Sequence, residues 1–288
     1  MGDSRSVMDA NVFLAVLAAA AFHAGWNAML KVRLEPLVAV SLIAAASGLA
    51  AFPLLFFVRS PDPASWPFIA ASLAIHLVYY VALAEAYRTG DVGQVYPIAR
   101  GTAPLLTAAG AALIFGENLG GIGAAGITLL GGGVVLLSWK GGRELEAFDA
   151  RAVGFALITA AAIAAYTLSD GIGARRAGGA LPYIAWLFVF DGLMMLAFGL
   201  IRFPKALLYQ GLAAWRVVLA GGALSCAAYA IAIWAMTRAP VALVAALRET
   251  SVLFAALIGV IWLKEPLLRI RILAALLVVA GMVLVRLK

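Results

Sequence analysis

Ten apolar runs, each about long enough to cross a lipid bilayer, occupy most of this chain of 288 residues. A membrane-spanning helix needs roughly 20 mostly apolar residues. Hydrophobic residues make up 65% of the chain and charged residues 12%, about half the charged fraction of a soluble domain. A soluble core cannot hide this much apolar surface, so we expect an all-α, polytopic membrane protein. The runs lie at 11–31, 37–58, 68–88, 92–115, 119–138, 152–172, 181–202, 212–236, 240–263 and 267–286.

The net charge of +7 does not indicate a nucleic-acid partner. The basic residues stand at the ends of the apolar runs, where such side chains anchor helices among lipid headgroups. The single cysteine, Cys226, permits no disulfide and no thiol-based zinc site. We therefore expect no cofactor, no metal and no nucleic acid. The first run has the flanks of a signal peptide, but nine further runs follow, so we interpret it as an uncleaved first helix.

One pattern occurs twice in the chain. Residues 82–137 align without a gap on residues 230–285, an offset of 148. Because each copy belongs to a group of five runs, an odd number, the second group enters the membrane from the opposite side. We predict ten transmembrane helices in two inverted five-helix repeats, at 1–139 and 152–288, joined by a loop at 140–151. The alignment superposes Arg100 on Arg248, Thr102 on Thr250 and Glu117 on Glu265.

Inverted repeats of this kind are typical of secondary transporters, whose substrate site lies between the two halves. The charge pattern bears on orientation. Leaving out the two arginines of the repeat, the side with the termini carries seven basic residues and the opposite side twelve. The positive-inside rule would then place the termini outside the cell.

The repeated unit resembles the EamA-type repeat of the drug/metabolite transporter superfamily. The resemblance is carried by residues 87–104 followed by Gly116-Glu117, and by residues 236–251 followed by Lys264-Glu265-Pro266. The opening residues 22–27 are similar to one bacterial branch. The resemblance implies ten helices and transport, often export, of small organic metabolites. The resemblance also implies a multi-pass protein of the bacterial inner membrane with cytoplasmic termini. This orientation is opposite to the one that the count of basic residues favours, and we adopt the orientation that the resemblance implies.

Arg100 and Arg248 are each the ninth residue of an apolar run, roughly 12 Å deep. A buried guanidinium can bind a carboxylate, phosphate or phosphonate at two points, so we expect at least one arginine to contact the substrate. The alternative is that each is structural. Arg248 stands next to Glu249, and we expect it to be the more structural of the two. The carboxylates available for such pairing are Glu85, Asp170, Asp191 and Glu249.

Tyr96 precedes Arg100 by one helical turn and joins it on one face. Pro97, Gly101 and Pro104 lie in the same run and predict a kinked or broken helix that lines a cavity, with an ordinary proline kink as the alternative. Other polar and aromatic residues inside runs are further candidates for substrate binding, although each can instead pack between helices. These are His23, Trp26, Asn27, Tyr80 and Trp234.

We expect a secondary transporter, with export as the expected direction, for a small amphipathic and at least partly anionic organic metabolite. The chain can act as a monomer or a homodimer, and it is not expected to be an enzyme. The alternatives are an intramembrane enzyme, for which Asp170 and Asp191 would form the catalytic pair, and a non-transporting membrane sensor. Proton coupling, if transport uses it, is expected at Glu249, Glu85, Asp191 or His76.

Overall fold

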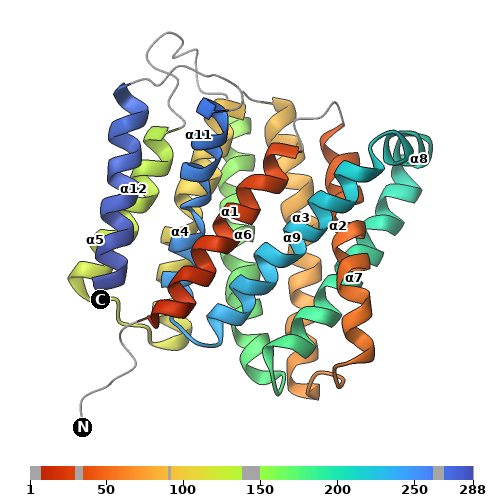
Figure 1. Ribbon diagram of the computed structural model, residues 1–288, viewed down its shortest axis with the longest axis horizontal. Coiled ribbons are helices and arrows are strands. Elements are labelled where there is room, and N and C mark those ends of the chain that lie inside the picture. Colours follow the sequence, from red (N-terminus) through yellow and green to blue (C-terminus); the bar gives the residue numbers. More distant parts are fainter. Residues whose placement is uncertain (1–7, 30–34, 90–91, 138–149, 262–268, 288) are drawn as a thin grey trace.

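The computed structural model describes residues 8–29, 35–89, 92–137, 150–261 and 269–287, and these residues form helices and connecting turns without a strand (Figure 1). The first half holds α1 (Ala10–Met29), α2 (Pro36–Ala51), α3 (Trp66–Thr89), α4 (Val92–Phe115) and α5 (Gly120–Leu137), with short 3₁₀ turns η1 (Phe52–Phe56) and η2 (Pro63–Ser65). The second half holds α6 (Ala150–Arg176), α7 (Ala180–Arg202), α8 (Pro204–Ala213), α9 (Trp215–Met236), α10 (Val241–Arg248), α11 (Ser251–Ile261) and α12 (Arg269–Leu287).

Eight stretches of the described helices are long and apolar enough to cross a membrane. One of them, 241–258, combines α10 and α11. The two remaining apolar runs correspond to α5 and α12, which are shorter than a full span within the described residues. An all-helical, polytopic architecture is therefore confirmed, and the count of ten spans stays a prediction.

The connections follow from local sequence. α2 and α8 begin at Pro36 and Pro204, where a proline costs no helix hydrogen bond. Gly116 and Gly178 have φ values of +65° and +72°, which only glycine adopts easily, and they turn the chain after α4 and after α6. The sequence did not predict α8. This short helix exposes Leu208, Tyr209 and other apolar side chains at one end of the bundle, as helices at a membrane surface do (Figure 1).

The helix contacts have two-fold character. α2 packs on its counterpart α7, and α5 packs on its counterpart α12. α3 packs on α6, and the symmetry-equivalent contact between the halves joins α9 to α1. α4 packs on α6, and α11 packs on α1 in the same way. In Figure 1 α1 begins and α12 ends at the lower end of the bundle, while α1 and α6 run in opposite directions.

Small residues allow α5 and α12 to approach closely. A side chain at Gly281 would meet the backbone oxygen of Gly126 at 2.6 Å, and one at Gly133 would meet the backbone oxygen of Ala274 at 3.0 Å. Part of the glycine-rich face of α5 therefore serves packing within the chain. Whether the chain also forms a homodimer stays a prediction.

The predicted helix break lies in the other repeat. α4 runs without interruption from Val92 to Phe115, and Gly101 lets it pack against Gly131 of α5. The second repeat breaks instead at Glu249 and Thr250, between α10 and α11. There the amides of both residues bond three residues back, to Ala246 and Leu247, in 3₁₀ fashion. The Thr250 hydroxyl also donates to the Leu247 carbonyl at 2.7 Å, which favours the break.

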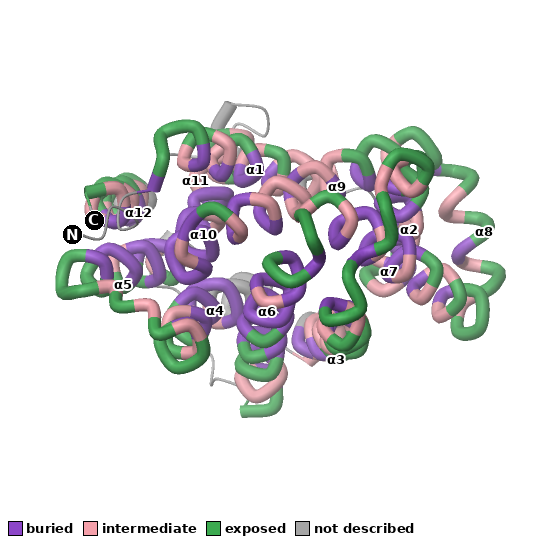
Figure 2. The backbone as a smooth tube through the Cα atoms, turned by 90° about the horizontal axis from the view of Figure 1, so that it is seen from below, coloured by how far each residue is buried: buried purple, intermediate pink, exposed green. Residues whose placement is uncertain are grey.

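The core lies where the repeats meet. Every residue of α10 from Val241 to Leu247 is buried. Figure 2, seen along the bundle from below, shows buried backbone concentrated in α10 and in parts of α4 and α6. The broken helix of the second repeat is therefore an internal element, and polar groups beside the break can face the first repeat.

Candidate functional site

A buried ion pair joins the two repeats at the helix break. The Nε atom of Arg100 in α4 lies 3.0 Å from Oε2 of Glu249, and both side chains are more than 90% buried. The Nη2 atom of Arg100 also donates to the Ser251 hydroxyl at 3.4 Å. The guanidinium is thus held by both residues that flank Thr250.

Arg248 lies differently, although it aligns with Arg100 in the repeat. Its guanidinium carbon stands 4.7 Å from the centre of the Tyr229 ring, over the face of that ring. In the part of the chain that the structure describes, Arg248 has no ion pair and no side-chain hydrogen bond. The sequence predicts that Arg248, next to Glu249, is the more structural arginine. Neighbouring helical side chains point about 100° apart, and Glu249 pairs with Arg100 instead.

Tyr229 also connects Arg248 to a buried carboxylate. Asp170 in α6 is fully buried and accepts hydrogen bonds from the hydroxyls of Tyr183, at 2.9 Å, and of Tyr229. The Tyr229 ring therefore carries Arg248 on its face and Asp170 at its hydroxyl.

Aromatic rings from three helices surround this group. The His76 ring in α3 stacks on Tyr166 in α6, with centroids 4.3 Å apart and planes 19° apart. The Tyr166 ring meets Tyr229 edge to face at 5.7 Å. Tyr166 also lies within electrostatic reach of both Arg100 and Arg248. Flat apolar faces and two guanidinium groups therefore occur together where the repeats meet.

The α1 residues His23, Trp26 and Asn27 interact with one another. The Trp26 indole donates to Nδ1 of His23 at 3.2 Å, which assigns the ring proton of a neutral His23 to Nε2. The Asn27 amide donates to the His23 carbonyl at 2.8 Å. Arg100 and Arg248 both lie within electrostatic reach of His23. The structure thus brings this part of α1 to the same region as Arg100 and Arg248.

Two predicted residues pair between α3 and α7. The Tyr80 hydroxyl donates to Oδ2 of Asp191 at 3.2 Å. Asp191 is buried, and its other oxygen, Oδ1, has no hydrogen-bond partner. The Tyr80 ring is part of the aromatic group through its stacking with His76 at 6.0 Å.

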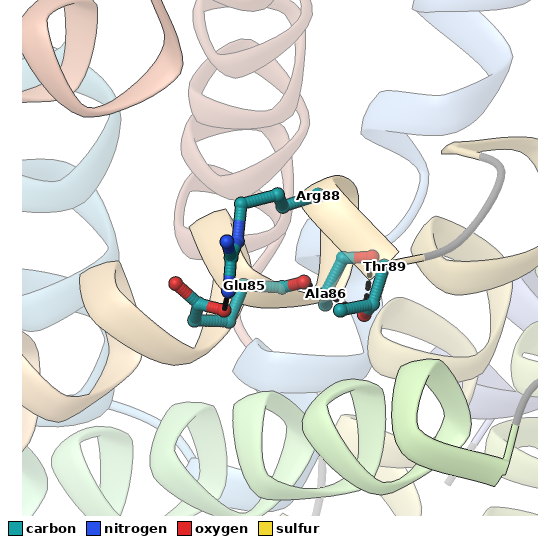
Figure 3. A network of polar contacts seen from close by, with 4 residues as sticks. All are labelled: Glu85, Ala86, Arg88 and Thr89. Carbon is teal, nitrogen blue, oxygen red and sulfur yellow. Dashed lines mark hydrogen bonds and ion pairs between the residues drawn. The ribbon is translucent and has the colours of Figure 1, made fainter.

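Other predicted residues are not brought to this region. Glu85 pairs with Arg88 one turn later, at 2.7 Å near the end of α3, and both side chains are partly exposed (Figure 3). Trp234 lies under the Arg238 guanidinium, beside an open cleft of about 300 Å³ near the end of α9. The side chain of Tyr96 lies outside the described residues.

Glu117 links the repeats at the end of α4. Its carboxylate accepts the first two amides of α10, from Val241 at 2.8 Å and Ala242 at 3.2 Å. Arg175 of α6 lies 3.8 Å from the same carboxylate and donates to the Met236 carbonyl at 2.9 Å. Glu117 therefore caps a helix of the opposite repeat, and the equivalent Glu265 lies outside the described residues.

Several residues of the site escaped prediction. Ser251 aligns with Ala103 in the repeat, so the internal comparison could not mark it. Tyr166 precedes Asp170 by four residues and faces the same side of α6, a spacing that could have drawn attention to it. Tyr183 of α7 donates to the Asp170 carboxylate on the neighbouring helix α6. Only the packing of the helices shows that relationship.

Comparison with known proteins agrees with this architecture. The model of the EamA-like transporter family matches residues 10–139 and again residues 150–287. A solved structure described as "Crystal structure of protein" superposes with a TM-score of 0.73 at 17% sequence identity, covering 96% of this chain and 95% of its own, which shows a shared fold. No curated protein matches the sequence. Because two copies of the family model cover most of its length, the chain belongs to the EamA-like transporter family of multi-pass membrane proteins.

Proposed function

We propose that the chain is a secondary transporter for a small amphipathic, at least partly anionic organic metabolite, and that Arg248 is its principal anchor for the anionic group. The observation that carries this proposal is the Arg248 guanidinium, which stands over Tyr229 without an ion pair or side-chain hydrogen bond among the described residues. A charge inside membrane-spanning helices is costly and marks a functional site. A guanidinium offers five donors, which suit a carboxylate, phosphate or phosphonate.

The surrounding rings support the amphipathic part of the proposal. Tyr229, Tyr166 and His76 form a continuous set of aromatic contacts beside the arginine. Aromatic faces pack well against an apolar or planar portion of a ligand. Arg100, in contrast, is held by Glu249 and Ser251, so we assign it first to joining the repeats.

We further propose ten spans in two inverted repeats, with α5 and α12 as the shortest spans. The symmetric pairing of helices and the opposite directions of α1 and α6 support this arrangement. Secondary transporters with inverted repeats bind substrate at the repeat interface, where broken helices are common. The break between α10 and α11 lies beside Arg248. For direction and location we propose export across a bacterial inner membrane, as the family resemblance implies.

Counterflow in proteoliposomes tests the transport proposal. The purified full chain is reconstituted, and exchange is measured for labelled amphipathic carboxylates and phosphonates and for amines matched to them in size. We expect exchange of at least one anionic compound above the rate in protein-free vesicles. Exchange restricted to the amines would contradict the anionic assignment, and no exchange of any compound in an intact, folded preparation would contradict transport of this class.

A further inference from the structure

Two buried carboxyl groups on adjacent helices have unequal sets of hydrogen-bond donors. Asp170 of α6 has a tyrosine hydroxyl on each oxygen, from Tyr183 on Oδ1 and from Tyr229 on Oδ2. Asp191 of α7 has only the Tyr80 hydroxyl, on Oδ2, and its buried Oδ1 has no hydrogen-bond partner. The two carboxyl groups lie within electrostatic reach of each other.

We propose that Asp191 is a proton-binding site that alternates between the acid and the carboxylate, while Asp170 remains a fixed negative charge. An ionised carboxylate inside a membrane protein needs donors or cations around it. Asp170 has two donors and Asp191 has one, so their environments separate the two roles. The inference rests on the proposed transport function in that the proton would couple to substrate movement.

Tyr80 suits both states of Asp191. A phenolic hydroxyl can donate or accept. When Asp191 is ionised, the hydroxyl of Tyr80 donates to Oδ2. When a proton adds to Oδ2, the new O–H bond donates to the Tyr80 oxygen, and the phenolic proton stays on Tyr80 and turns away. One hydrogen bond joins the two side chains in each state, so the proton can bind and leave without rearrangement of the helices.

The groups around Asp191 do not neutralise it. α7 packs against α2, α3, α6, α8, α9 and η1. α2 and η1 carry no charged or titratable side chain, α3 contributes Tyr80, and α6 contributes Asp170. Tyr229 of α9 is already bound to Asp170. The one charged residue of α8 is Lys205, which follows the end of α7 in the chain. Among the described residues, no lysine, arginine or histidine is within ion-pair distance of Asp191.

Infrared spectroscopy over a pH titration tests the proposal with the proton itself as the ligand. A protonated carboxyl group shows a carbonyl stretch that an ionised carboxylate lacks. The lipid-reconstituted full chain should show such a band, which should lose intensity as pH rises. Asp191→Asn should remove the band, while the matched change Asp170→Asn should leave it. A band that survives Asp191→Asn unchanged, or no titrating band in the wild type, would overturn the proposal.

Tyr80→Phe keeps the test decisive if Asp191→Asn does not fold. Loss of the phenol removes the one hydrogen bond to Asp191, so the band should move in frequency and titrate at a different pH. An identical band in this variant would show that the proton is held elsewhere.

A transport measurement separates this inference from the proposed function. Vesicles that contain the protein are supplied with an anionic compound that exchanges in counterflow, and a pH gradient is imposed across the vesicle membrane. Wild-type vesicles should accumulate the compound above its equilibrium level, whereas vesicles with the Asp191→Asn variant should reach only that level. Absence of counterflow in the wild type at equal pH would tell against the transport proposal. Counterflow with gradient-driven accumulation that persists in Asp191→Asn would tell against this inference alone.

Discussion

Arg100 and Glu249 form a buried ion pair, 3.0 Å between Nε and Oε2, that ties the continuous helix of the first repeat to the broken helix of the second. The guanidinium further reaches Ser251 across the break. This contact places the discontinuity of the second repeat against the one helix of the first repeat that carries the equivalent arginine. The interface between the repeats is therefore held by charge as well as by packing.

Removing one partner of this pair should destabilise the protein. A buried charge without its partner costs about 3–5 kcal/mol, so Arg100→Gln should lower the melting temperature in detergent. The double variant Arg100→Gln with Glu249→Gln should recover part of the loss because no unpaired charge remains. Arg238→Gln, at an exposed arginine near the end of α9, is the control. An unchanged melting temperature in Arg100→Gln would contradict a structural role for the pair.

The tyrosine hydroxyls should matter through Asp170. Tyr183→Phe leaves Oδ1 of that buried carboxylate without its donor, a loss of about 1–3 kcal/mol. Differential scanning fluorimetry should show a lower melting temperature. Tyr209→Phe removes the hydroxyl of an exposed tyrosine in α8 and should have no effect. Equal melting temperatures for the two variants would mean that the Asp170 contact is not stabilising.

Glu117 should protect the first turn of α10. Glu117→Ala removes the acceptor of the Val241 and Ala242 amides, and loss of a helix cap costs about 0.5–2 kcal/mol. Hydrogen exchange followed by mass spectrometry should show faster exchange at the start of α10. Glu117→Gln keeps one acceptor oxygen and should show a smaller change. If the amides at the start of α10 exchange hydrogen as slowly in both variants as in the wild type, the Glu117 cap does not stabilise this turn.

Close packing of α5 on α12 should make Gly281 intolerant of a side chain. An added Cβ would meet backbone atoms, the Gly126 oxygen at 2.6 Å and the Leu130 nitrogen at 2.8 Å, so the helices must move apart. Overpacking of this kind costs about 1–3 kcal/mol, and Gly281→Ala should melt at a lower temperature. At Gly132 nothing lies within 4 Å, so Gly132→Ala should be neutral or stabilising. The reverse order of the two variants would contradict the packing.

Hydropathy and repetition made much of the architecture predictable. Each apolar run of the sequence contains a helix or a pair of helices, because a bilayer admits few other backbone structures. The helix break at Thr250 was not predictable from helix-breaking residues, because neither glycine nor proline occurs there. Prolines in α4 predicted a break that does not occur. Tertiary packing and the Thr250 hydroxyl decide the outcome.

Partners of buried charges were the least predictable feature. Glu249 adjoins Arg248 in sequence, yet it pairs with Arg100, 149 positions away by residue number. Glu85 has the sequence context of an intramembrane carboxylate, but α3 extends far enough to place it at a partly exposed end beside Arg88. A sequence shows which charges lie in apolar runs, whereas the rotation and length of each helix decide which charges meet.

The most direct test of the central claim is counterflow of the exchanging anionic compound by Arg248→Gln, with the melting temperature measured on the same preparation. The account predicts a melting temperature close to that of the wild type, because only a cation–π contact of about 0.5–2 kcal/mol is lost, together with loss of exchange. Retained exchange by a folded Arg248→Gln protein would contradict the claim that Arg248 anchors the substrate.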